Sequence, residues 1–124
     1  MKTATYLTMG GLLASLALVV APKTAMAQDM AKVAPSSTKV VLENDRVRVL
    51  EVRQKPGEKG AMHSHPASLI CPVSTSKAKF TSSDGKTTES ELKAGAVTWR
   101  EAETHAVENV GTTDSHVLVI ELKK

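Results

Sequence analysis

From Lys39 onward the chain consists of short runs of β-branched and other apolar residues separated by turn residues, which is typical of a small all-β sandwich or barrel. Asp84-Gly85 lies between two of these runs and is a strong hairpin signal. No part of this region shows the roughly 3.6-residue period and the capping residues of an amphipathic helix. We therefore expect an all-β fold over residues 39–124, a small antiparallel β-barrel. The expected strands cover residues 39–43, 46–54, 63–65, 69–73, 77–82, 86–92, 96–100, 105–110 and 116–122.

The first 27 residues have the organisation of an export signal. Lys2 gives a positive start, an apolar run covers residues 9–21, and Ala25-Met26-Ala27 has the small-x-small form of a signal-peptidase site. The run is shorter than the roughly 20 apolar residues of a membrane-spanning helix, and no cysteine directly follows it to carry a lipid anchor. We expect a signal peptide over residues 1–27, cleavage after Ala27, and a periplasmic or secreted mature protein.

The segment after this cleavage site, residues 28–38, contains Pro35-Ser36-Ser37 and few large apolar residues, so we expect it to be flexible. Loss of Lys2 and Lys23 with the signal would leave 14 of the 16 basic residues against 13 acidic ones. A mature chain this close to neutrality gives no reason to expect a nucleic acid or, after signal cleavage, a membrane as partner.

Three histidines in the β-rich region have metal-ligand chemistry. His63 and His65 are two residues apart, so on a strand both side chains point to the same face. His105 lies in a later run and could supply a third imidazole. Imidazole suits a divalent transition metal (Fe, Zn, Ni, Cu or Co) better than Mg or Ca, which prefer oxygen ligands. The pattern predicts one transition-metal site, and no catalytic residue can be assigned from it.

The histidines also lie in two short motifs that resemble those of the cupin superfamily. Gly57, followed after five residues by His63-Ser64-His65, is similar to the first half of the first cupin motif. Gly95 and the sequence His105-x-x-x-Asn109 resemble the frame of the second motif. The resemblance covers residues 40–122 and implies a double-stranded β-helix of the jelly-roll type. It also implies that the metal ligands would be the two first-motif histidines, a Glu and the second-motif histidine.

The first motif departs from the cupin pattern where its carboxylate ligand should lie. That Glu would fall at position 69 or 70, and these positions are Leu69 and Ile70. By the resemblance three of four ligands remain, and the less negative site would favour a small anionic ligand. Glu101 and Glu103, just before His105, are candidates for a replacement carboxylate. We expect them instead in a solvated turn, because charged residues between strands are usually exposed.

Three further side chains bear on the site. Cys71 has no partner for an intramolecular disulfide and is expected to be a small buried side chain. The alternative for Cys71 is a resemblance to thiol dioxygenases, cupin-like enzymes with three histidines on iron and often a Cys near the Glu position. His116 is in phase with Leu118 and Ile120 and could face the interior, where a hydrogen-bonded histidine is favoured over a fourth ligand. Trp99 is expected in the core.

We therefore expect an exported cupin that binds one divalent transition metal through a three-histidine site, with its substrate unassigned. If it is an enzyme, the first expectation is an oxygen-using or isomerase-type reaction on a small anionic molecule. The alternative is a non-catalytic cupin without metal that binds a small ligand or forms a homodimer.

Overall fold

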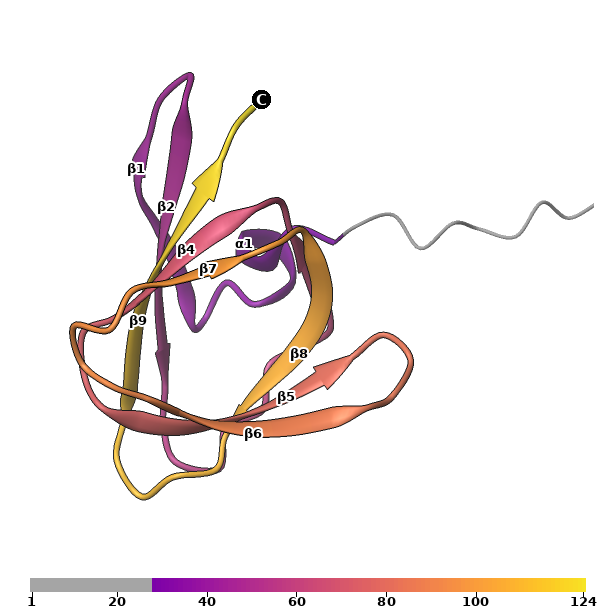
Figure 1. Ribbon diagram of the computed structural model, residues 1–124, viewed down its shortest axis with the longest axis vertical. Helices are drawn as coiled ribbons and strands as arrows, with labels where there is room; N and C mark the ends of the chain where they lie inside the picture. The colour runs from indigo at the N-terminus through magenta and orange to yellow at the C-terminus, as the bar shows by residue number, and fades with distance from the viewer. Residues whose placement is uncertain (1–27) are drawn as a thin grey trace, which may run out of the picture.

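Two antiparallel sheets face each other in the computed structural model, which describes residues 28–124 (Figure 1). The five-stranded sheet has the order β1 (Thr38–Glu43), β2 (Val47–Gln54), β9 (Ser115–Leu122), β4 (Ser68–Pro72) and β7 (Thr98–Arg100). The four-stranded sheet has the order β3 (His63–His65), β8 (Glu103–Asn109), β5 (Ser76–Ser82) and β6 (Thr87–Leu92). The expected signal peptide over residues 1–27 and its cleavage after Ala27 lie outside the described residues.

The all-β prediction is confirmed, and each expected run overlaps one observed strand. The hairpin signal is also confirmed, because β5 pairs with β6 and Gly85 adopts the positive φ of 85° that favours glycine in such a turn. The two sheets form separate ladders and do not close into the expected barrel, so the domain is a two-layer sandwich with open edges. Over residues 28–124, no helix is long and apolar enough to cross a membrane.

The apolar core lies on the inner face of the five-stranded sheet. Leu50 on β2 is the register partner of Val119 on β9, and Val52 is the partner of Val117. All four side chains are buried. Alternate residues of each strand point between the sheets, so two adjacent strands supply a continuous apolar surface.

The inward face of β9 differs from the prediction for His116. The buried residues of this strand are Val117, Val119 and Glu121, so the half-buried His116 belongs to the opposite face. The prediction that His116 could face the interior is wrong, because both faces of β9 carry apolar residues and a two-residue period does not tell which one is covered. His116 is nevertheless paired, since its Nε2 lies 3.1 Å from Glu51 Oε2.

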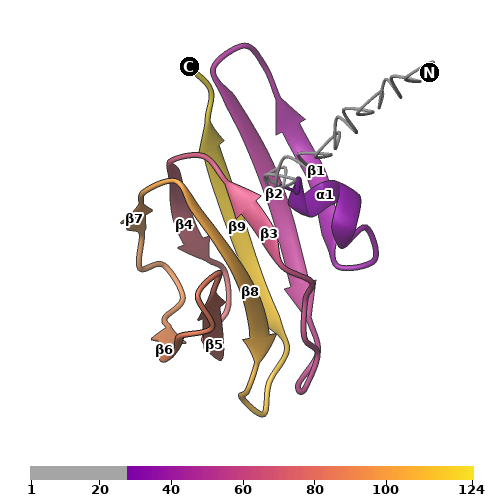
Figure 2. The same cartoon turned by 90° about the vertical axis from the view of Figure 1, so that its right-hand side faces the viewer.

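Residues 28–38, expected to be flexible, begin with a packed segment. Its helix α1 (Met30–Val33) is one turn long, and Asp29 caps it by accepting a hydrogen bond of 2.9 Å from the backbone N–H of Ala31. The helix packs against β1 and β3, which are edge strands of the two sheets (Figure 2). Met30 is buried in the apolar core. One long apolar side chain thus anchors a segment whose composition otherwise indicates flexibility.

Asn109, from the second cupin-like motif, has a structural position at the end of β8. Its Nδ2 donates to the carbonyl oxygens of Gln54 (3.1 Å) and Thr113 (2.8 Å), and its Oδ1 accepts from the backbone N–H of Gly111 at 3.0 Å. A buried amide with these partners holds the turn between β8 and β9. It therefore supports the strand that carries His105 without facing that residue's cavity.

Candidate metal centre

The structure brings the three sequence-predicted histidines together where β3 pairs with β8. His63 and His105 are register partners, and His65 is two residues along the same face of β3. The ring centre of His63 lies 4.8 Å from those of His65 and His105, which are 5.4 Å from each other. Their candidate ligand nitrogens all lie within 4.8 Å of one another, and all three side chains are buried. This spacing is compatible with a single metal ion.

Two of the imidazoles are oriented by oxygen atoms at Nδ1. His63 Nδ1 is 2.8 Å from the carbonyl oxygen of Ala61, and His65 Nδ1 is 2.7 Å from Glu121 Oε2. An oxygen that accepts a hydrogen bond from Nδ1–H leaves the lone pair on Nε2 free to coordinate a metal. His63 Nε2 is buried and has no hydrogen-bond partner. Such an unpaired nitrogen, next to two more imidazoles, fits a metal ligand.

Burial controls the charge of the histidines. Burial, together with the neighbouring His63, His65 and Arg100, lowers the pKa of His105 to about 3. Burial also lowers the pKa of His63, although the hydrogen bond to the Ala61 carbonyl opposes this. Both imidazoles are therefore uncharged at neutral pH, which is the form that coordinates a metal ion.

Glu121, which sequence analysis missed, is 2% exposed and lies between the sheets. Its Oε1 accepts a hydrogen bond of 2.8 Å from Arg48 Nε, and the guanidinium Nη2 forms an ion pair with the same oxygen at 2.6 Å. Burial alone would raise the pKa of Glu121, but the hydrogen bonds from His65 and Arg48 outweigh it and hold the pKa below its usual value. The signal in the sequence was its position, since Glu121 continues the alternation of Val117 and Val119.

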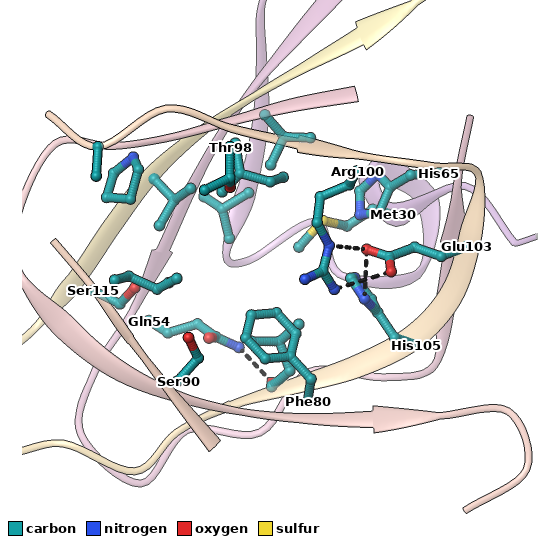
Figure 3. Close-up of a pocket in the computed structure, with 18 of the residues that line it drawn as sticks. Met30, Gln54, His65, Phe80, Ser90, Thr98, Arg100, Glu103, His105 and Ser115 are labelled. Atoms are coloured by element: carbon teal, nitrogen blue, oxygen red, sulfur yellow. Dashed lines mark hydrogen bonds and ion pairs between the residues drawn. The ribbon is translucent and has the colours of Figure 1, made fainter. Parts of the chain in front are cut away.

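Glu103 and Glu101 have different surroundings. Glu103 begins β8 and lines the cavity, where it accepts hydrogen bonds from Arg100 Nε (2.9 Å) and Nη2 (3.0 Å) (Figure 3). Its Oε1 also lies 3.1 Å from His105 Nδ1, without hydrogen-bond alignment. The prediction of a solvated turn is wrong for Glu103, because β8 begins at this residue and not at His105 as expected. It is confirmed for Glu101, which is exposed and bonds to Trp99 Nε1.

A cavity of about 240 Å³ opens beside the histidines. Ile70 lines it, whereas Leu69 and Cys71 do not. The side chain at the place of the missing carboxylate is therefore Ile70, and the half-buried Cys71 points elsewhere. Trp99 also lines the cavity but is 51% exposed, so its expected place in the core is wrong. On the other side, the guanidinium of Arg100 lies 5.0 Å from the Phe80 ring centre.

No profile of a known protein family and no curated protein matches the sequence. Among solved structures, a cupin domain from Bordetella pertussis Tohama I is 29% identical, with a TM-score of 0.65 over 70% of this chain and 92% of that one. A protein with a double-stranded β-helix domain from Klebsiella pneumoniae is 26% identical, with a TM-score of 0.54 over 70% and 83% of the two chains. A cupin superfamily protein from Desulfitobacterium hafniense is 19% identical, with a TM-score of 0.54 over 70% and 76%.

These likenesses and the two facing sheets define the class of the domain as a double-stranded β-helix protein. The similarity to cupin-domain structures supports the cupin superfamily that the two histidine motifs indicated. Its site departs from the cupin pattern in having Ile70 at the cavity in place of the Glu.

Lowering the pH from about 7 to 5 should destabilise the metal-free protein through His105. The pKa of His105 is lower in the folded chain than its ordinary value of 6.5, so the unfolded state binds more protons and stability falls as the pH drops below 6.5. Between about pH 7 and pH 5, this one residue should lower the free energy of unfolding by about 2 kcal/mol. Urea unfolding of wild type and His105→Gln at both pH values measures it. The variant should lose about 2 kcal/mol of the pH dependence, and an unchanged dependence would contradict the account.

Proposed function

We propose that this cupin binds one divalent transition metal ion through His63, His65 and His105. The observation that supports the proposal is the buried, unpaired Nε2 of His63 inside a cluster of three imidazoles. A site of three nitrogen ligands suits Fe, Zn, Ni, Cu or Co better than Mg or Ca. The signal peptide expected over residues 1–27 would place this function in the periplasm or outside the cell.

We propose a small anionic molecule as the ligand of the site. Three neutral imidazoles do not compensate the charge of a divalent ion, and they leave coordination positions open. The nearby carboxylates are engaged, Glu103 with Arg100 and Glu121 with Arg48. An ion held there would act as a Lewis acid on a bound oxygen, and the Arg100–Glu103 pair lies at the cavity wall.

A second candidate function is a non-catalytic module that binds a small ligand or a second copy of the chain. The cavity supports binding of a small ligand, because Phe80 and Trp99 give it apolar walls without any metal. Pairing with a second copy of the chain is supported by the edge strand β1, which exposes Val40, Val41 and Leu42. Metal content distinguishes these candidates from the metal-binding function.

Protein stripped of metal and dialysed against Zn²⁺, Co²⁺ or Ni²⁺ should retain about one equivalent through gel filtration. His63→Ala and His105→Ala should each abolish this retention, because two ligands rarely hold such an ion tightly. His116→Ala is the matched control, since His116 pairs with Glu51 and does not line the cavity. Elemental analysis of the eluted protein gives the stoichiometry. The proposal fails if no ion is retained by the wild type, or if His116→Ala loses the ion equally.

Ile70→Glu should restore a carboxylate at the cavity and raise the affinity for Zn²⁺ by about tenfold, or roughly 1.4 kcal/mol. The same variant should be less stable without metal, because it buries an unpaired carboxylate beside the core. Leu69→Glu is the matched control, since the neighbouring residue does not line the cavity. Calorimetric titration measures both affinities. Equal effects of the two variants would show that position 70 does not face the metal.

A further inference from the structure

We propose that the N-terminal segment, residues 28–34, helps to orient the metal ligand His65. It does so through a series of contacts between charged side chains, Asp29–Arg48–Glu121–His65. This inference rests on the proposed metal site, because its purpose is to hold one ligand of that site. Asp29, Arg48 and Glu121 are positioning residues, since they act on the metal only through His65. The contacts join the N-terminal segment to both sheets.

The first contact joins the N-terminal segment to the five-stranded sheet. Arg48 on β2 donates from Nη1 to Asp29 Oδ2 at 2.6 Å and from Nη2 to Asp29 Oδ1 at 2.9 Å. The geometry is the two-pronged pairing that guanidinium and carboxylate groups favour. The hydrogen bonds from Arg48 also lower the pKa of Asp29, so this carboxylate is charged at neutral pH. The pair is partly buried, which makes it stronger than an exposed ion pair.

The next contacts extend from Arg48 to the histidine. Arg48 and Glu121 are register partners on β2 and β9, and the guanidinium bonds to Glu121 Oε1. The other carboxylate oxygen, Oε2, accepts the hydrogen bond from His65 Nδ1 across the gap between the sheets. Glu121 thereby fixes the proton of His65 on Nδ1 and its lone pair on Nε2. Arg48 holds Glu121 in the orientation that this requires.

The N-terminal segment also supports the histidine strand directly. The carbonyl oxygen of Gln28 accepts a hydrogen bond of 2.8 Å from the backbone N–H of Ser64, between the two histidines of β3. Since β3 is only three residues long and lies at a sheet edge, this contact pairs a backbone donor that would otherwise be free. Met30 completes the arrangement by lining the cavity next to the histidines (Figure 3).

A double-mutant cycle on Zn²⁺ affinity tests the proposal. Glu121→Gln should raise the dissociation constant by about 10- to 100-fold, because it replaces the acceptor that orients a ligand. Asp29→Asn should raise it by a smaller factor. The double variant should lose less affinity than the sum of the two single variants, because Asp29 acts on His65 through Glu121. Asp45→Asn is the matched control, the same substitution at an exposed residue, and should leave the affinity unchanged.

Nitrogen-15 NMR of the metal-free protein provides a readout that does not need the metal. His65 should be in the Nδ1–H tautomer in the wild type. Asp29→Asn and Glu121→Gln should each show a mixture of the two tautomers, with the larger shift in Glu121→Gln. Additive losses of affinity, or an unchanged tautomer in Glu121→Gln, would overturn the proposal. If the wild type binds no metal, the proposed function fails, and the tautomer of His65 alone decides this inference.

Discussion

Glu121 lies between the two sheets, where it accepts hydrogen bonds from His65 of one sheet and Arg48 of the other. In this buried position, loss of the carboxylate would leave the Arg48 cation and the His65 Nδ1–H without their partner. The strand β3 has three residues and lies at an edge, so its own ladder contributes little to the placement of its histidines. The contact with Glu121 therefore determines how His65 is presented to the cavity.

The interior of the sandwich contains an apolar core and, on the facing sheet, a cluster of imidazoles. The five-stranded sheet contributes Leu50, Val117 and other apolar side chains that stabilise the fold. The facing part of the four-stranded sheet contributes imidazoles, which burial keeps uncharged in the case of His63 and His105. The three imidazoles bring no negative charge to a bound cation, while Glu103 is paired with Arg100 and Glu121 shares Arg48 with Asp29. This charge balance connects the loss of the cupin Glu with a preference for an anionic ligand.

The strands and the histidine cluster could be predicted, because both follow from local patterns: turn residues between apolar runs, and a spacing of two on a strand. The phase of Glu121 with Val117 and Val119 did not suffice to predict its role, since both faces of β9 are apolar and its partners Arg48 and His65 are far away in sequence. The packing of the N-terminal segment depends on the burial of Met30 and on the pairing of Asp29 with Arg48, which composition does not detect. The open sandwich was also missed, because alternation within strands does not show whether the end strands pair.

The central claim is that three imidazoles of this chain hold one metal ion. X-ray absorption spectroscopy of the protein loaded with one equivalent of Zn²⁺ tests it most directly, because scattering within the imidazole rings allows them to be counted. The account predicts three imidazole nitrogens at about 2.0–2.1 Å, with oxygen from water or an added anion in the open position. A spectrum that requires two or fewer imidazoles would contradict it.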